Sequence, residues 1–332
     1  LAESGFIPDA LIKIAARYIS NKRISKSSID YSKPEIINAL SKGVVAEKTS
    51  DANKQHYEVP PEYFYHVLGT NLKYSCSLFD NVNSLDEAET SMLELYIERA
   101  NIRDGHEILD LGCGWGSFSL YVAKKYPNTN ITSVSNSSDQ ITYIKNEARK
   151  RGLSNIKAYR MDVNSLELNT QFDRIISIEM FEHLRNYKLI LSSLNNLLKP
   201  DGRLFIHIFC HKKLTYFYEM KNNFDWMTKY FFQGGIMPSK DIFEYFDDEL
   251  EIINQWDING NHYSETCKAW LNNHYKNRKK ILDIFHKHYD KPKIWFNRWR
   301  IFFLSCEAFF ALNNGKEYFV SHYLLKKKSG HE

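Results

Sequence analysis

The sequence lacks a long apolar run and lacks a strong excess of one charge. None of its apolar stretches reaches the roughly 18 residues that a membrane span requires. Its 44 lysines and arginines nearly balance 40 aspartates and glutamates, and the net charge of +4 gives no electrostatic reason to expect a nucleic-acid partner. We therefore expect no nucleic-acid binding and no stable membrane insertion of this 332-residue chain.

Cysteine pairs are missing as well. The five cysteines are an odd number and none stands in C-x-x-C spacing, which argues against a disulfide framework and a zinc site. The first 20 residues contain no basic segment followed by a clean apolar stretch, so we expect no secretory signal. These absences predict a cytoplasmic protein without a bound metal.

Glycine is scarce, whereas aromatic residues are plentiful. Five of the 14 glycines fall in two short motifs, 112–116 and 234–235. Phe, Tyr and Trp make up 14% of the sequence and crowd the segments on either side of residues 107–209. We expect many of these rings in the core and the others in an apolar pocket that can hold a cation.

Strands and helices alternate through the middle of the chain, where short apolar runs predict strands and amphipathic stretches predict helices. The predicted strands cover 107–112, 130–136, 156–162, 172–180 and 203–209, and the predicted helices cover 117–126, 139–151 and 181–199. Alternation of this kind is typical of a parallel, doubly wound α/β sheet.

The segments on either side of this region show other patterns. Residues 1–50 and 86–100 predict helices. Two late strands, 250–258 and 317–328, enclose a helical stretch at 264–312 and would add an antiparallel pair to the sheet.

These patterns divide the chain into three parts. A helical N-terminal lid covers 1–80, the βα core covers 81–210, and a substrate cap with a helical insertion and the last two strands covers 211–332.

The glycine motif DLGCGWG (110–116) lies between the first strand and its helix. A dinucleotide fingerprint would be GxGxxG, but here Gly116 comes one residue early. The second strand also ends in Ser135 and Asn136, where an acidic ribose ligand would mark NAD. A GxGxG turn suits S-adenosylmethionine (SAM), which has no phosphate, although an ordinary strand-to-helix turn is the plain alternative. Asp162, after the third strand, could accept from an adenine amino group or could cap a turn.

Three polar residues follow the fourth strand. Glu179, Glu182 and His183 are spaced by three and four, which would place them on one face of a helical turn. The carboxyl ends of parallel strands are where open α/β folds bind ligands. A carboxylate beside a histidine forms a base with an orienting group. A surface histidine with a helix-dipole glutamate is the alternative.

Seven motifs, in this order and spacing, resemble the SAM-dependent methyltransferase family of the plant coclaurine and pavine N-methyltransferases, which is related to the cyclopropane fatty acid synthases. They are QHYEVPPEYF (55–64), LKYSCSLF (72–79), ILDLGCGWGSFSLY (108–121), SIEMFEHL (177–184), FIHIFCHK (205–212), KYFFQGGIMPS (229–239) and NGNHYSETCKAWL (259–271). The resemblance implies a Rossmann-like class I methyltransferase with a seven-stranded, mostly parallel sheet and an antiparallel last strand.

The resemblance also implies residue roles. Glu179 and His183 match the catalytic pair, with Glu182 beside them. Residues implied at the cofactor are Tyr74, Ser75, Gly112, Gly114, Asn136, Gln140, Asp162 and Val163; those implied at the substrate are Tyr57, Glu58, His207 and Tyr263. The implied partner is a small-molecule amine, such as a benzylisoquinoline-type alkaloid, and a homodimer is compatible with the sequence.

Two other functions stay open. Cyclopropane synthases act on a lipid double bond and hold a bicarbonate, whose implied ligand positions are Cys76, Glu182, His207 and Tyr263. However, Glu179 stands where those enzymes usually have glycine, and a carboxylate favours a cationic amine over an alkene. A SAM-binding module without catalysis is the third function, but the intact chemical positions argue against it.

Overall fold

The computed structural model describes residues 2–30, 33–47, 59–219 and 226–328. Tyr57 and Glu58, which we expect to contact the amine, lie outside these ranges.

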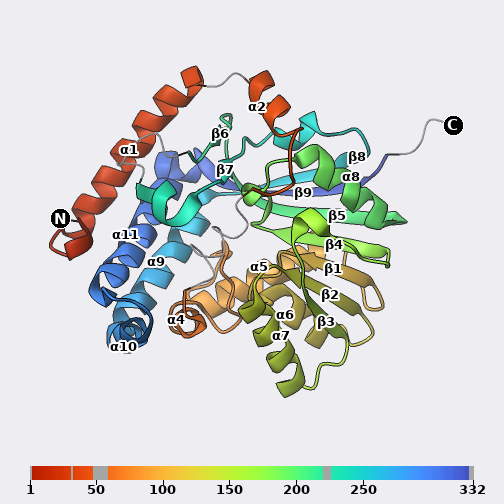
Figure 1. Cartoon of the computed structure of the whole chain (residues 1–332), viewed down its shortest axis with the longest axis horizontal. Helices are drawn as coiled ribbons and strands as arrows, with labels where there is room; N and C mark the ends of the chain where they lie inside the picture. The colour runs from red at the N-terminus through yellow and green to blue at the C-terminus, as the bar shows by residue number, and fades with distance from the viewer. Residues whose placement is uncertain (1, 31–32, 48–58, 220–225, 329–332) are drawn as a thin grey trace.

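A seven-stranded sheet forms the centre of the molecule (Figure 1), in the order β3-β2-β1-β4-β5-β9-β8. Its strands are β1 (Glu107–Leu111), β2 (Asn130–Ser135), β3 (Ile156–Arg160), β4 (Phe172–Ile178), β5 (Leu198–His211), β8 (Leu250–Ile258) and β9 (Tyr318–Lys327). The first five pair in parallel, and β9 runs antiparallel to both β5 and β8. The predicted mostly parallel sheet with an antiparallel last strand is therefore confirmed.

Helices cover both faces of this sheet. They are α5 (Leu85–Arg99), α6 (Ser117–Lys125), α7 (Ser138–Lys150) and α8 (Tyr187–Leu197). Apolar side chains of α5 and α6 pack with Ile108 and Phe205, while those of α8 pack with the alternate residues Leu109 and Leu204. Adjacent residues of a strand point to opposite faces, so these short apolar runs are buried on both sides.

The helix α5 has a well-defined start. Ser84 accepts a hydrogen bond from the backbone of Glu87, and the Glu87 side chain accepts one from the backbone of Ser84, which forms a capping box. The helix then buries Met92, Leu93 and Tyr96 against the sheet. This packing places Tyr96 beside His207 on β5 and, three residues later, Arg99 beside His322 on β9.

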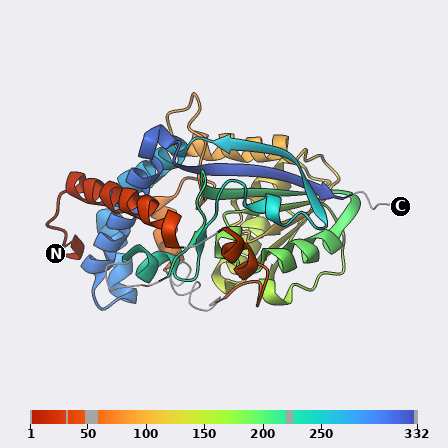
Figure 2. The same ribbon diagram turned by 90° about the horizontal axis from the view of Figure 1, so that it is seen from above.

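A helical layer lies at one end of the sheet, on the side away from the C-terminus (Figure 2). It contains α1 (Asp9–Asp30), α9 (Gly260–Lys276), α10 (Arg278–His288) and α11 (Pro292–Phe310), with α4 (Pro61–Val67) alongside. Helix α1 packs on α11, where Asp9 accepts hydrogen bonds from Tyr275 and Arg300. The short helix α2 (Lys33–Ala39) lies beside α8 instead.

The described residues of the cap between β5 and β8 form little regular structure. It has two short strands, β6 (Tyr216–Phe217) and β7 (Ile236–Met237), and single turns at Thr228–Phe232 and Ile242–Tyr245. One buried cluster joins α4, α5, the cap, α9 and α11, so the lid, core and cap share side-chain packing. In the described part of the chain, no helix is both long enough and apolar enough to span a membrane.

Gly260 provides a test of how tightly α9 is seated. A Cβ at this position would come under 3.0 Å from the backbone oxygens of Tyr318 and Phe310, so neither neighbour can move aside cheaply. We expect Gly260→Ala to lower the free energy of unfolding by about 3 kcal/mol, as overpacking does. Urea unfolding followed by circular dichroism measures this.

The control is Gly105→Ala. Gly105 has a left-handed φ of +90°, yet an added Cβ would meet nothing within 4 Å. We expect Gly105→Ala to lower the free energy of unfolding by about 1 kcal/mol, because only the left-handed backbone of alanine is unfavourable there. Equal losses in the two variants would contradict close packing at Gly260.

Candidate functional site

The glycine turn after β1 adopts a conformation that most residues avoid. Gly112, Gly114 and Gly116 have φ values of +78°, +53° and +76°. A Cβ at Gly112 would meet Met180 at 2.9 Å, whereas one at Gly114 would meet nothing within 4 Å. The turn therefore packs tightly on one side and opens into a cavity on the other.

This cavity lies where we expect the cofactor. Five of the predicted cofactor residues line it: Gly112, Gly114, Asn136, Gln140 and Val163. The other lining residues are Ala46, Glu47, Leu111, Val134, Ser135, Met161, Glu179, Met180, His183 and Leu184. Open backbone at Gly114 and polar side chains at the end of β2 suit the amino acid and ribose parts of SAM, which carry no phosphate.

Three predicted cofactor residues are not among those that line this cavity. Asp162 lies between the lining residues Met161 and Val163, and its carboxylate accepts hydrogen bonds from the backbone and side chain of Asn164. Tyr74 lines a different and larger cavity. Ser75 is buried and accepts a 2.6 Å hydrogen bond from the Lys73 ammonium.

Sequence reasoning missed Ala46 and Glu47 at the cofactor cavity. Both lie in the segment that follows α2, and Ala46 is held there by Asn164, which bonds its backbone N–H and C=O at 3.0 Å. A contact across this length of chain leaves no periodic signal in the sequence.

The larger cavity has a volume of about 590 Å³ and lies between α1, α9, α11 and the cap. Its walls are largely apolar and aromatic, as the composition predicted, and include Tyr74, Tyr218, Trp226, Phe232 and Tyr263. Other rings singled out by the sequence, such as Tyr63 and Phe64, are plain core.

Glu179 and His183 are the residues that line both cavities. They stand just beyond the end of β4, at the sheet edge where the sequence places the chemistry. These two side chains therefore stand at the boundary between the two cavities.

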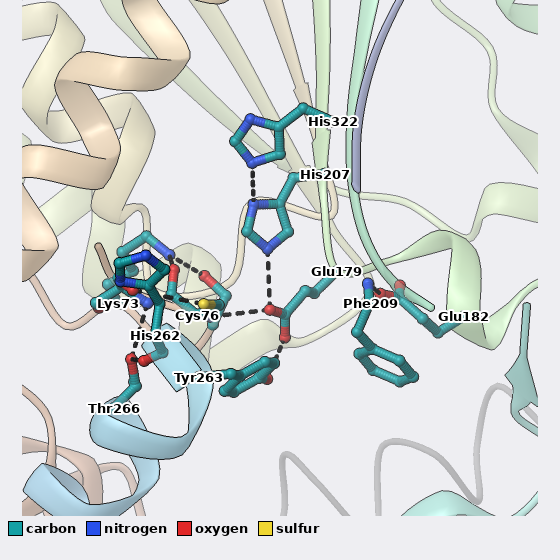
Figure 3. Close-up of polar contacts among 12 residues, drawn as sticks. Lys73, Cys76, Glu179, Glu182, His207, Phe209, His262, Tyr263, Thr266 and His322 are labelled. Atoms are coloured by element: carbon teal, nitrogen blue, oxygen red, sulfur yellow. Dashed lines mark hydrogen bonds and ion pairs between the residues drawn. The ribbon is translucent and has the colours of Figure 1, made fainter. Parts of the chain in front are cut away.

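The carboxylate of Glu179 is held from three sides (Figure 3). Its Oε1 accepts a hydrogen bond from the backbone N–H of Cys76 at 2.9 Å and lies 3.1 Å from His207 Nε2, within hydrogen-bond distance. Its Oε2 accepts from the Tyr263 hydroxyl at 2.6 Å. Burial raises the pKa of Glu179, while the positive charge of Lys73 and the bonds from Cys76 and Tyr263 oppose that rise.

Glu179 also has a strained backbone. Its φ is +48°, a value that is uncommon for a residue with a side chain, and its N–H donates to the His207 carbonyl at 2.8 Å. Strain of this kind persists only where the surroundings fix it, and it is common at active sites.

The expected helical turn carrying Glu179, Glu182 and His183 on one face does not form. A left-handed residue cannot continue a right-handed helix, so only a short turn at Phe181–His183 follows it. Glu182 points into the protein, where its Oε1 accepts a 2.8 Å bond from the Phe209 backbone (Figure 3). Its Oε2 has no hydrogen-bond partner among the described residues, and burial beside Glu179 raises its pKa strongly.

His183 stays at the boundary between the cavities, and its ring is parallel to that of Phe232, with 6.5 Å between the centroids. Burial lowers the pKa of His183 to about 4, and the charge of Glu179 opposes that shift. The hydrogen bonds of Glu179 go to Cys76, His207 and Tyr263, so its influence on His183 is electrostatic.

Three of the four positions implied for a bicarbonate converge on one point. Cys76 through its backbone, His207 and Tyr263 are all hydrogen-bonded to Glu179. A carboxylate of this chain therefore occupies the place where those donors would meet a small anion.

Comparisons with known proteins agree with this geometry. A family model described as mycolic acid cyclopropane synthetase matches residues 45–318. The (S)-coclaurine N-methyltransferase of Thalictrum flavum subsp. glaucum is 39% identical over 340 residues, covering 98% of this chain and 94% of that protein.

Solved structures show the same relationship. A coclaurine N-methyltransferase bound to N-methylheliamine and SAH superposes with a TM-score of 0.92 at 37% identity, covering 98% of this chain and 97% of that one. A cyclopropane synthase from Mycobacterium tuberculosis has a TM-score of 0.72 at 18% identity, covering 84% and 98%, and shares the fold. The chain is thus a SAM-dependent methyltransferase and belongs to the family of the coclaurine and pavine N-methyltransferases, which is related to the cyclopropane synthases.

Proposed function

We propose that this enzyme methylates the nitrogen of a small-molecule amine of the benzylisoquinoline type, with His183 as the base and Glu179 as its anionic neighbour. The observation that carries the proposal is that these two residues line both the cofactor cavity and the large aromatic cavity. Relatives with this activity, (S)-coclaurine and pavine N-methyltransferases, support it.

The proton of the amine explains the need for a base. An alkylamine is mostly protonated at neutral pH and must lose a proton before its lone pair can attack. His183 is neutral at that pH because burial lowers its pKa to about 4, so its ring can accept. The nearby charge of Glu179 favours the protonated ring.

Charge and shape of the large cavity suit the same substrate. When bound, SAM supplies an electrophilic methyl carbon, whose bond to sulfur breaks as its bond to nitrogen forms, leaving SAH. Aromatic faces stabilise a nearby cation, and the Glu179 carboxylate adds negative charge at the same end of the cavity. The cavity size fits a molecule with several rings.

Lipid methylenation is less well supported. The implied bicarbonate would need the donors of Cys76, His207 and Tyr263, and these already bind Glu179. Two carboxylate-sized anions cannot share that point without repulsion.

The roles of Tyr57, Glu58, Tyr74, Ser75 and Asp162 stay predictions. So do the homodimer and the cytoplasmic location.

Transfer of labelled methyl from SAM to a panel of acceptors tests the function. We expect label in benzylisoquinoline-type amines and none in vesicles of unsaturated phospholipid. Label in the lipid with inert amines would reverse the assignment.

Two substitutions test the catalytic residues. His183→Ala removes the base and Glu179→Gln removes the charge while keeping the shape. General acid–base groups contribute about 100-fold or more, so each variant should lose at least that in kcat/KM.

Glu265→Gln is the control, because Glu265 is exposed on α9 and pairs with Lys268 away from both cavities. Normal activity in folded His183→Ala and Glu179→Gln proteins would rule out the proposed roles.

Chemical rescue tests the carboxylate position. Glu179→Gly removes the side chain and tolerates the left-handed backbone, leaving the donors of Cys76, His207 and Tyr263 around an anion-sized space. We expect added formate or bicarbonate to restore part of the lost methyl transfer in this variant. Glu179→Gln keeps an amide in the space and should not respond; equal responses would contradict an anion-binding position.

A further inference from the structure

A line of buried polar side chains leads away from Glu179 on the side opposite Tyr263. His207 on β5 and His322 on β9 are paired directly in the antiparallel register, and both are fully buried. His322 Nε2 lies 2.9 Å from His207 Nδ1, and His207 Nε2 lies 3.1 Å from Glu179 Oε1 (Figure 3). Directly paired residues point to the same face of a sheet, which brings the rings together.

Arg99 ends this line. Its guanidinium lies 2.8 Å from His322 Nδ1 and stacks over Trp256, with 5.0 Å from Cζ to the ring centroid. Trp256 is the partner of His322 on β8, so the sheet register also sets the position of the arginine.

The arginine fixes the direction of every bond in the line. A guanidinium can only donate, so His322 Nδ1 must accept and the proton of that ring must be on Nε2. His322 Nε2 then donates to His207 Nδ1, which leaves the proton of His207 on Nε2, facing Glu179. Burial lowers the pKa of both histidines well below the ordinary value, so both rings are neutral and a single tautomer of each fits.

If the direction of these hydrogen bonds were reversed, Glu179 would have to be neutral. If both histidines changed tautomer, His207 Nε2 would present a lone pair to Glu179, and only a protonated Glu179 could donate to it. His322 would then present an N–H to the N–H of Arg99, which is repulsive. Arg99 therefore disfavours the protonated form of Glu179, even though two imidazole rings separate the two side chains.

The Tyr96 hydroxyl does not set this direction. It lies 2.9 Å from His207 Nδ1, but a hydroxyl can donate or accept and so can adapt to either tautomer.

We propose that Arg99 and His322 are positioning residues that hold His207 as a donor and thereby keep Glu179 ionised for amine methylation. Their role in catalysis rests on the proposed function, whereas the direction of the bonds does not.

Other groups also act on Glu179 and stay constant in the test. Facing it are Lys73 and Cys76 from the loop before α5, Tyr96 from α5, Glu182 and His183 from the turn after β4, and Tyr263 from α9. His183, with a pKa of about 4, gives no acid limb above that value. Burial raises the pKa of both Glu179 and Glu182, so the limb reports these two carboxylates together, and the test lies in its shift between variants.

The first experiment measures the tautomers directly. Long-range ¹H–¹⁵N spectra of the folded enzyme distinguish the two imidazole nitrogens, and the spectra of His207→Gln and His322→Gln assign them. We expect the proton on Nε2 in both rings of the unaltered chain. A proton on Nδ1 of His322 would overturn the proposal, whether or not an amine is methylated.

The second experiment measures the pH dependence of kcat/KM. Arg99→Met keeps the aliphatic stem but removes the donor, and His322→Phe removes the link. In both we expect the acid limb to move up by about one pH unit, the size expected when one hydrogen bond to a buried carboxylate is lost.

Conservative variants should restore the profile. Arg99→Lys still donates, and His322→Gln can accept from Arg99 through its oxygen and donate to His207 through its nitrogen. Arg103→Met, an exposed arginine four residues away, is the control. A merely structural role would lower kcat without moving the limb, and an unmoved limb in folded Arg99→Met and His322→Phe would overturn the proposal.

Discussion

The site depends on a carboxylate held out of water. The side chain of Glu179 is only 10% exposed, and its burial raises its pKa and favours the neutral form. The charge of Lys73 and hydrogen bonds from Cys76 and Tyr263 oppose that rise. The polar groups around the carboxylate come from three separate parts of the chain: the loop at Cys76, strand β5 at His207 and helix α9 at Tyr263. The seating of α9 and the register of the sheet therefore bear directly on the charge at the centre of the enzyme.

The same carboxylate separates two chemistries built on one fold. The donors around it could hold a small free anion, as is implied for the cyclopropane synthases. In this chain the anion is part of the protein, and it stands at the boundary of a cavity lined with aromatic rings. An attached anion needs no binding step and attracts a cation, which agrees with the amine acceptor proposed above.

Local pattern was enough to predict the fold. The apolar runs at 107–112 and 250–258 became β1 and β8 nearly to the residue, because short buried strands flanked by turn residues leave a clear signal. The glycine turn also gave the cofactor cavity, since its left-handed residues need glycine. The resemblance supplied the rest of the expected site.

The predictions that were wrong or missing concern residues whose positions depend on contacts between distant parts of the chain, which the sequence alone does not show. Spacing suggested one helical face for Glu179 and Glu182, but the left-handed backbone at Glu179 sends them to different surroundings. Nothing in the segment after α2 marked Ala46 as a neighbour of the glycine turn. Arg99 and His322 lie far apart in the sequence and became visible only through the strand register.

The position of β9 has a consequence for how the enzyme is made. This strand follows β8 along the chain, yet it lies between β5 and β8 in the sheet. Strands β5 and β8 therefore do not pair with each other and are joined only through β9. Pairing across such distances is slow compared with local helix formation. We therefore expect the sheet to be completed late, so that the pairing of His207 with His322 beside Glu179 forms in the same step that closes the sheet.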